Sequence, residues 1–339
     1  GLAKAQDFVE LRALATVQGI AIAPIADDLK AELSVDKVLL TRPTGLTLSD
    51  ASMPEQDGLA RAVTFDTKLW RTDRDAPFVE REYDLLNRAA GAPFTQRNAR
   101  RLDLARFYFA RQMFPEAKAV LDVAVTDERP TAADPSPLVL RAAANIMLGR
   151  VDAAEKDLAN PVVGNQNDAQ LWRGLAFARQ GKWAQAHDAF RGVEGALSVL
   201  PLELQRVALT DALRASVEVG DVTGAVNRIN DFKTVGTPPD LEPTISVLVG
   251  RLAERMGRTQ DALAAYSSAA SSSDRGAAAQ GRLREIALRY AQGEMKKADA
   301  INELEILTTS WRGDETEAEA LQMLARFYTE ENHYRDSFH

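Results

Sequence analysis

The chain of 339 residues contains no cysteine and only three histidines. Without cysteine it can form no disulfide, no cysteine nucleophile and no thiolate metal site. The spacing of His187, His333 and His339 does not match that of a metal site, so solvated or partly packed imidazoles are the favoured interpretation. No apolar run reaches the length of a transmembrane helix. We therefore expect no metal site and no transmembrane segment in these residues.

Catalytic and cofactor motifs are missing as well. The sequence contains no dinucleotide-binding glycine motif, no Walker A motif and no nucleophile elbow. Gly181-Lys182 lacks the earlier glycine and the following Ser or Thr of a phosphate loop. The carboxylates within 315–319 cluster at a predicted helix start, where the helix dipole favours negative charge, and Asp314 is the expected N-cap. We expect no enzyme activity, no catalytic residue and no cofactor.

The negative net charge also limits the classes of partner that the chain is expected to bind. The net charge is −8 and the pI is about 5.2, whereas nucleic acids and anionic membranes attract a positive field. We therefore expect no nucleic-acid partner. Arginine outnumbers lysine 31 to 10, which is typical of GC-rich bacterial genomes.

The first residue is glycine and no signal peptide is present, so either a leader has been removed or the sequence is a piece of a longer protein. A periplasmic or cell-envelope location is favoured over the cytoplasm.

One short sequence is present twice. Leu-Ala-Arg-Phe-Tyr occurs at 104–108 and again at 324–328, which is 220 positions later. Each copy is followed at the same offset by an aromatic residue, Phe114 or Tyr334. Such a duplication marks the two ends of a repeat array. Arrays of this kind act as binding scaffolds rather than catalysts.

A small residue recurs between these two copies at a nearly constant step. It follows a glycine or polar residue by five positions, as Ala186 follows Gly181. The glycine suits a helix end, because a residue without a Cβ takes positive φ without strain. The mean step is roughly 37 residues, within the range of helical repeats. The sequence predicts about seven units, with small residues at Ala117, Ala154, Ala186, Ala225, Ala262, Ala298 and Ser337; the turn residue before the first of them is Gln112.

Each unit is predicted to be a pair of helices joined by a short turn. Within 171–177 the apolar side chains recur at three and four positions, the spacing of one helix face. Trp183, Ala186 and Phe190 share one stripe of the next helix, and neither helix can bury its stripe alone. We expect Ala186 at a helix crossing, with Trp183, Phe177 and Phe190 buried around it.

This pattern resembles the tetratricopeptide repeat (TPR) family over about residues 97–339. The small residues of the family's helix crossing match Gly174 with Ala186 and Gly250 with Ala262. Its aromatic positions match Tyr108, Phe177, Phe190, Tyr266 and Tyr328. The resemblance implies a mostly α fold, an α-solenoid of TPR-like helix pairs, and a role in protein–protein interaction.

The chain departs from the family in two respects. Its period exceeds the usual 34 residues, and Arg141 and Asn145 stand where apolar residues are expected. We still expect at least twelve antiparallel helices from Asn98 onward, stacked in sequential pairs into a right-handed curved array. Strands are expected only within the first 65 residues.

The amino-terminal quarter has β-prone runs at 19–24, 33–35, 38–41 and 46–48, separated by turn residues. They predict a small sheet. Pro77 begins a linking helix that runs to about Ala90 and is broken by the following Gly-Ala-Pro. The predicted domains are therefore a small β-containing N-terminal segment over 1–75, a linking helix and turn over 76–96, and the TPR-like α-solenoid over 97–339.

The last unit stops early in its second helix. That helix would begin after Asn332 with Tyr334 and Phe338, yet the sequence ends at His339. An open solenoid end leaves an apolar stripe in water unless a polar helix caps it. We expect that the solenoid is truncated here, and that the residues after Asn332 are frayed or rest on a neighbouring molecule.

Four of the seven units carry an arginine eleven residues before the small residue: Arg106, Arg214, Arg251 and Arg326. In the TPR family this position faces a groove that grips peptide backbones and carboxylates, and a guanidinium can make two parallel hydrogen bonds to a carboxylate. The resemblance therefore makes these arginines candidate peptide-binding residues. The competing and favoured interpretation is pairing along each helix, with Asp103, Asp211, Glu254 and Glu330 respectively.

Three functional hypotheses follow. The leading one is a non-enzymatic scaffold whose groove binds a peptide or helix of a partner protein. The alternative is the non-catalytic scaffold region of a larger cell-envelope enzyme, whose catalytic residues would lie outside this sequence. A third is an oligomerisation module, which leaves self-association open. The partner is expected to be a protein or peptide, and its identity is not readable from the sequence.

Overall fold

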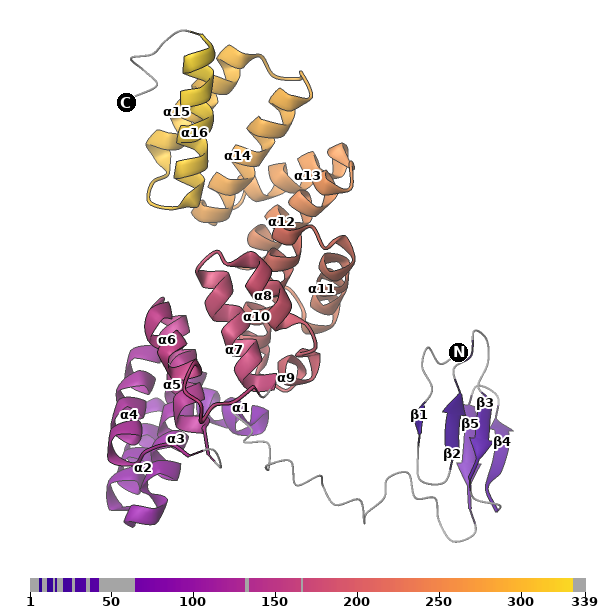
Figure 1. Cartoon of the computed structure of the whole chain (residues 1–339), viewed down its shortest axis with the longest axis vertical. Helices are drawn as coiled ribbons and strands as arrows, with labels where there is room; N and C mark the ends of the chain where they lie inside the picture. The colour runs from indigo at the N-terminus through magenta and orange to yellow at the C-terminus, as the bar shows by residue number, and fades with distance from the viewer. Residues whose placement is uncertain are drawn as a thin grey trace. The chain divides into compact units, whose positions relative to one another are not determined.

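The computed structural model describes residues 6–7, 11–14, 16, 21–25, 28–34, 37–42, 65–131, 134–165 and 167–331. The chain divides into two units, Gly1–Ala62 and Val63–His339. In the described residues the first unit contains only strands and the second is built of helices (Figure 1). The predicted class, a mostly α helical-repeat fold with a small β-containing N-terminal segment, is confirmed.

The described residues of the first unit form two small antiparallel sheets. One has the order β1 (Gln6–Asp7), β2 (Leu11–Leu14), β3 (Ala21–Pro24). The other is the pair of β4 (Lys30–Ser34) and β5 (Lys37–Thr41). Antiparallel strands close in sequence need only short connections, which agrees with the turn residues between the β-prone runs.

Three of the four predicted strands correspond to strands of the structure. The runs 19–24, 33–35 and 38–41 overlap β3, β4 and β5 respectively. The run 46–48 lies outside the described residues. The strands β1 and β2 were not predicted, because two and four residues are too few to show an alternating pattern.

The first helix, α1 (Thr67–Asp75), belongs to the second unit. Its N-cap is Asp66, whose carboxylate accepts the backbone N–H groups of Lys68 and Leu69 at 2.7 and 3.1 Å. The sequence interpretation had placed these residues in the β-containing segment. The chain instead divides after Ala62. The helix has only two apolar residues, Leu69 and Trp70, which are adjacent and do not show a helical spacing in the sequence.

The remaining helices follow one another in sequential pairs. The linking helix predicted from Pro77 is α2 (Phe78–Gly91). In the described residues, fourteen helices follow it, against at least twelve expected. They are α3 (Phe94–Ala110) and α4 (Phe114–Asp127), α5 (Ser136–Met147) and α6 (Val151–Leu158), α7 (Asn167–Arg179) and α8 (Trp183–Phe190), the short α9 (Glu194–Ser198), α10 (Leu202–Val219) and α11 (Val222–Val235), α12 (Glu242–Arg255) and α13 (Thr259–Ala270), α14 (Arg275–Ala291) and α15 (Lys297–Ser310), and α16 (Glu315–Glu330).

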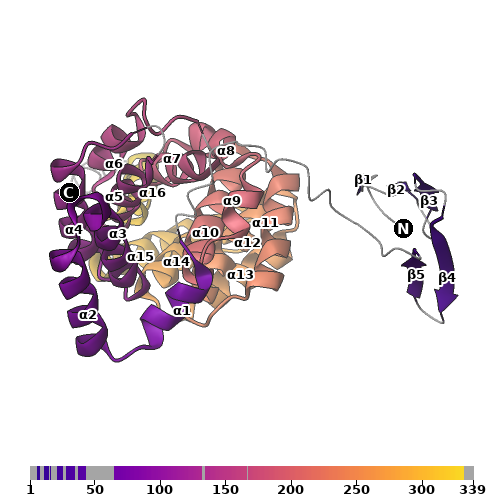
Figure 2. The same cartoon turned by 90° about the horizontal axis from the view of Figure 1, so that it is seen from below.

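Figure 2 shows that successive pairs turn about a common axis, so the array is wound rather than straight. The predicted second helix of the last unit, and its fraying after Asn332, concern residues outside the described part of the chain.

The turns within the pairs use left-handed residues, as predicted. Gly149, Gly181 and Gly220 have φ values of 71°, 70° and 81°, a conformation that costs glycine nothing. Gln112 holds the same place between α3 and α4 with a φ of 59°, and it is the one non-glycine residue with a positive φ in the described part of the chain. Its alignment with the turn glycines, inferred from the repeat, is confirmed.

Small residues lie where two helices come closest. Ala186 has no exposed surface and Phe190 is buried, and a Cβ on Gly174 would lie 2.9 Å from the Phe190 ring. The equivalent contact occurs two units later, where a Cβ on Gly250 would lie 2.5 Å from the Tyr266 ring. The predicted helix crossing in these two units is confirmed, because only a residue without a side chain lets the ring pack there.

Two aromatic residues of the third unit, which contains Ala186, are less buried than expected. Phe177 and Trp183 are only half-buried, although both pack against the main core. A cation lies over each ring: Lys182 Nζ is 5.7 Å from the centre of the Phe177 ring, and the Arg214 guanidinium is 4.7 Å from that of Trp183. Both rings therefore lie at the edge of the core, where a charged group can cover an aromatic face and stay in water.

The sixth unit has a different register from the predicted one. Ala298 was expected at the helix crossing, but it is exposed, while Ala300 is fully buried. In the other units the second helix begins two residues after the turn residue, whereas α15 begins at Lys297, four residues after Gly293. The two extra turn residues move the buried small residue by two positions.

Of the two residues that depart from the TPR pattern, Arg141 is accommodated by an ion pair, whereas the side-chain oxygen of Asn145 is buried without a hydrogen-bond partner in the described part of the chain. Arg141 donates to both carboxylate oxygens of Asp157, at 2.9 and 2.6 Å. This pair joins α5 to α6 in place of apolar packing. Asn145 is buried among the apolar residues of α5, with 2% of its surface exposed.

The helix α1 packs against the first helices of the array. Phe65, just before it, lies 5.5 Å from Trp70, 5.2 Å from Phe109 on α3 and 6.4 Å from Trp172 on α7, measured between ring centres. All four rings are buried. Arg74 at the end of α1 donates to Glu203 on α10 at 2.6 Å. The segment from Phe65 to Arg74 therefore contacts the first helices of three different units, α3, α7 and α10.

Candidate functional site

Two adjoining cavities lie along the array: α7, α10, α12 and α14 line one, and α1, α3, α4, α5 and α10 contribute to the other. One, of about 350 Å³, is lined by polar side chains such as Thr244 and Gln280 together with apolar ones. The other, of about 240 Å³, is mainly apolar and includes Trp70 of α1. Both are lined by Val207 and Leu241, so they adjoin each other. We call the two cavities together the groove.

Arg251 lies in the groove as part of a fixed ion pair. Its two terminal nitrogens donate to the two carboxylate oxygens of Glu218 at 2.6 and 2.8 Å, and each side chain is 16% exposed. Burial acts to raise the pKa of Glu218, but the hydrogen bonds and the charge of Arg251 outweigh it, so the pKa lies below its ordinary value. The pair joins α10 to α12 and keeps both groups charged.

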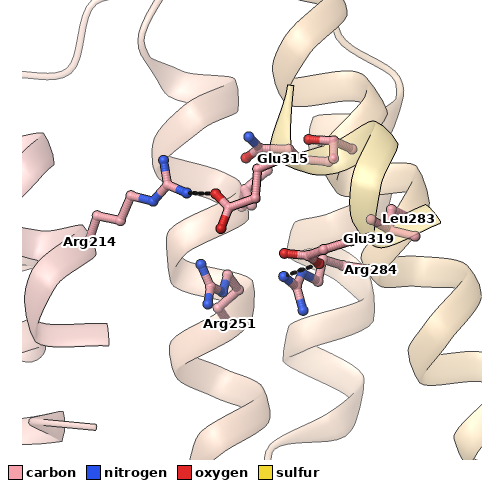
Figure 3. A pocket seen from close by; sticks show the side chains of 9 residues that line it. Arg214, Arg251, Leu283, Arg284, Glu315 and Glu319 are labelled. Atoms are coloured by element: carbon pink, nitrogen blue, oxygen red, sulfur yellow. Dashed lines mark hydrogen bonds and ion pairs between the residues drawn. The ribbon is translucent and has the colours of Figure 1, made fainter. Parts of the chain in front are cut away.

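Arg214 lies nearby and makes three different contacts. Its guanidinium lies over the Trp183 ring, its Nε is 3.7 Å from Glu218, and its Nη2 donates to Glu315 Oε2 at 2.6 Å. Glu315 is the first residue of α16, so the last contact joins residues 101 positions apart in sequence. Figure 3 shows Glu315 reaching back from α16 toward α10.

A third arginine completes the cluster. Arg284 on α14 donates to Glu319 of α16 at 2.7 Å. Arg214, Arg251 and Arg284 border a pocket of only about 20 Å³ together with Glu315 and Glu319 (Figure 3). The small volume means that the carboxylates of α16 leave little space between the guanidinium groups. We call these three arginines the arginine cluster.

The larger cavity is also lined by Asp211, a carboxylate whose pKa is raised. Asp211 on α10 pairs with Arg179 on α7 at 3.1 Å, and both line the larger cavity. Burial raises the pKa of Asp211 despite the nearby charges of Arg179 and Arg214. The groove therefore contains both signs of charge, and it is not a continuous basic stripe.

The structure brings only two of the four predicted arginines together. Arg214 and Arg251 line both the groove and the small pocket. Arg106 is half-buried in α3, where burial lowers its pKa. Arg326 is 61% exposed on α16, beside the Phe327 ring. Neither Arg106 nor Arg326 is among the residues that line these cavities in the described part of the chain.

The competing prediction of pairing along each helix is met at two of the four positions. Arg106 lies 3.7 Å from Asp103, and Arg326 lies 3.9 Å from Glu330. The other two expected partners pair elsewhere: Asp211 pairs with Arg179, and Glu254 accepts the hydroxyl of Tyr266 at 2.7 Å. At Arg214 and Arg251, contacts between units therefore add to or replace contacts within a helix.

Several members of the site were not predicted from the sequence. Arg179 and Arg284 occupy other positions of their units than the four aligned arginines, and the repeat offers no signal for them. Glu315 and Glu319 were interpreted only as charges that favour a helix start. Glu315 does lie in the first turn of α16, which Asp314 caps by accepting the N–H groups of Thr316 and Glu317, whereas Glu319 lies beyond that turn. Their second contact, across the groove, depends on the winding of the array.

The described residues contain no group of three or more histidine, cysteine or acidic side chains arranged to hold a metal ion. His187 is half-buried, and its Nε2 lies 2.9 Å from Asp221, the N-cap of α11. His333 and His339 lie outside the described residues. Among the described helices, none is long and apolar enough to cross a membrane.

No protein-family model and no curated protein matches the sequence. The fold is similar to solved structures. The crystal structure of the APC/C hetero-tetramer Cut9–Hcn1 has a TM-score of 0.50 and 12% identity, covering 76% of this chain and 48% of that one. A tetratricopeptide repeat protein from Parabacteroides merdae has a TM-score of 0.40 and 17% identity, covering 76% and 96%. The TPR domain of P58(IPK) has a TM-score of 0.27 and 18% identity, covering 71% and 70%.

This chain spans about half the length of the Cut9–Hcn1 chain that it matches. At such low identity the likeness concerns the fold alone. The paired helices, the left-handed turn residues and the glycine-to-ring contacts of the third and fifth units agree with it. The chain has a TPR-like helical-repeat fold.

Proposed function

We propose that the helical unit is a non-enzymatic scaffold that binds a partner protein, and that the groove holds a peptide or helix of that partner. The observation that carries the proposal is that two cavities adjoin along several units of the array. Two cavities of about 350 and 240 Å³ share Val207 and Leu241, and four consecutive first helices contribute to them. Two adjoining cavities lined by several successive units suit a chain segment better than a small molecule.

The chemistry of the groove supports a protein partner. The smaller cavity offers an apolar wall with Trp70, Leu204 and Leu241, where an apolar side chain of a partner would lose its contact with water. The larger cavity adds Thr244, Gln280 and charged groups that can orient a peptide backbone. A site with an apolar end and a polar end binds an amphipathic segment in one direction.

The charge pattern favours a protein segment over a nucleic acid. Asp211 and Glu218 lie beside the groove arginines, and they would repel a continuous line of phosphates. The Cut9–Hcn1 structure, which is similar in fold, is described as a hetero-tetramer, so the fold takes part in a protein assembly there. Partner binding by this chain is the corresponding proposal.

The proposal is tested by obstructing the groove. Thr244 lines the larger cavity and is half-buried, so Thr244→Trp would place an indole in the path of a bound segment. Thr309 is exposed on α15, a second helix, and Thr309→Trp makes the same chemical change there. Wild type and both variants are immobilised in equal amounts, and captured proteins are quantified by mass spectrometry from an extract of the native cell.

The expected result is one set of proteins captured by wild type and Thr309→Trp and strongly reduced on Thr244→Trp. Circular dichroism must show equal helix content in all three. Equal capture by Thr244→Trp and wild type would contradict the groove as the binding surface. Loss of capture only with Thr309→Trp would move the surface to the second helices.

A further inference from the structure

The arginine cluster is covered by carboxylates of the same chain. Glu315 and Glu319 are four residues apart on α16, so they lie on one helix face. Glu315 accepts from Arg214 on α10, and Glu319 accepts from Arg284 on α14 (Figure 3). One acidic helix face therefore rests on two guanidinium groups that come from two different units.

We propose that α16 is a built-in competitor for an acidic partner segment. The partner carries two carboxylates one helical turn apart and binds Arg214 and Arg284 by displacing Glu315 and Glu319. The inference rests on the proposed function, because it names the chemistry of the segment that the groove takes. It adds that the chain itself occupies this end of the site before the partner arrives.

The exposure of the carboxylates separates exchangeable pairs from fixed ones. The side chain of Glu315 is 62% exposed and that of Glu319 is 37% exposed, so water can solvate either carboxylate after it leaves its arginine. The Glu218 side chain is only 16% exposed and makes two hydrogen bonds to Arg251. Exposed ion pairs contribute little and exchange easily, whereas buried pairs are costly to break.

The cluster keeps its shape when the carboxylates of α16 leave. Arg214 remains over the Trp183 ring and near Glu218. Arg251 remains fixed by Glu218 at the pocket that it lines with the other two arginines. A partner with two carboxylates thus meets two arginines at the spacing that a helix face of this chain already fits, which is the charge complementarity that the site requires.

The experiment uses the chain's own acidic face as a probe. A fluorescein-labelled peptide with the sequence of residues 312–325 is titrated with the full chain at low salt, and its dissociation constant is measured by fluorescence anisotropy. The second probe is the same peptide with glutamine in place of the glutamates at 315 and 319. The proteins are wild type, the double variant Glu315→Gln/Glu319→Gln, and a control double variant.

The control, Glu317→Gln/Glu331→Gln, changes the net charge by the same amount. Glu317 accepts the backbone N–H of Gly313, and Glu331 lies at the end of α16, so neither contacts the arginine cluster. The control therefore measures the general gain in attraction for an acidic peptide. Any further gain in Glu315→Gln/Glu319→Gln comes from uncovering the cluster.

The acidic peptide should bind Glu315→Gln/Glu319→Gln about two- to thirtyfold more tightly than wild type, since two exposed ion pairs no longer compete. The control variant should show only a small part of this gain. Adding Arg214→Gln to Glu315→Gln/Glu319→Gln should remove the gain, as should raising the salt from about 0.05 M to about 0.5 M. The glutamine peptide should bind all proteins equally weakly.

Equal affinity of wild type and Glu315→Gln/Glu319→Gln for the acidic peptide would overturn the inference. So would a gain that is the same in the control variant. These failures are separate from a failure of the proposed function, which is measured by the loss of partner capture in Thr244→Trp. Partner capture could be lost in Thr244→Trp while wild type and Glu315→Gln/Glu319→Gln bind the acidic peptide equally. That result would support the scaffold function and reject α16 as a competitor.

Discussion

The backbone of Gly174 on α7 lies against the ring of Phe190 on α8, so close that a Cβ at position 174 would be 2.9 Å from the ring. The second helix of the unit is thereby held at one distance and one rotation from the first. Since the groove is lined by first helices, this contact also helps to position the side chains that face the partner.

Gly174→Ala should destabilise the chain by about 1–3 kcal/mol, because the added methyl group would push against the Phe190 ring. Gly195 on α9 is the matched control, since a Cβ there meets no atom within 4 Å and its φ is not in the left-handed region. Gly195→Ala should be neutral or stabilising by up to about 1 kcal/mol. Urea denaturation midpoints that do not distinguish the two variants would show that this contact does not constrain the helix pair.

The residues around this crossing should respond to changes in size in both directions. Ala186 has no exposed surface and Phe190 is 3% exposed. Ala186→Leu should cost about 1–3 kcal/mol by overpacking, and Phe190→Ala about 3–5 kcal/mol through lost burial and a cavity. Denaturation midpoints equal to that of wild type in both variants would contradict the packing of α7 against α8.

A reciprocal exchange tests the turn residues. Gln112 and Gly149 both have positive φ, at 59° and 71°, yet only glycine adopts this region without strain. Gln112→Gly should therefore stabilise by about 0.5–1 kcal/mol, and Gly149→Gln should destabilise by a similar amount. The measurement is the thermal midpoint of each variant. Shifts of the same sign in both would show that left-handed strain is not the controlling factor.

Asp211 should make stability depend on pH with an unusual sign. Burial raises the pKa of its carboxyl above the ordinary 3.8, so the folded state favours the protonated form. The contribution of the protonated Asp211 carboxyl to the free energy of unfolding is fully present below its ordinary pKa. It is lost as the pH rises through the pKa that the carboxyl has in the folded state. Asp211→Asn should thus raise the thermal midpoint at neutral pH, with a difference that falls toward zero near about pH 3.5.

Glu218 should show the opposite pH dependence when thermal midpoints are measured over the same pH range. The pKa of Glu218 is lowered, so its stabilising contribution is present above its ordinary pKa and is lost as pH falls through the folded pKa. Glu218→Gln should lower the thermal midpoint at neutral pH, and the difference should shrink in acid. A common direction for Asp211→Asn and Glu218→Gln would show that burial and the Arg251 pair do not act in opposite senses.

Much of the helical array could be predicted because its cause is local. A glycine five residues before a buried alanine sets the end of one helix and the packing of the next, and this relation is visible at Gly181 and Ala186 in the sequence alone. The sixth unit was misread because its turn has two more residues before α15. Helix α1 was missed because its few apolar residues pack on distant helices.

Only part of the site could be predicted. Arg214 and Arg251 share a repeat position, and the resemblance to the TPR family assigns that position to a groove. Glu315 comes within 2.6 Å of Arg214 only because the array winds through three further units. No spacing in the sequence encodes a contact across 101 residues. The contact between Arg214 and Glu315 is determined by the rotation between successive helix pairs. That rotation results from many small packing effects.

The central claim, that the groove binds the partner, is tested most directly by hydrogen–deuterium exchange of the full chain with and without the captured partner. The account predicts added protection in the first helices α10, α12 and α14, beginning with the segments around Val207, Thr244 and Gln280. Protection confined to the second helices α11, α13 and α15, with these segments unchanged, would contradict it.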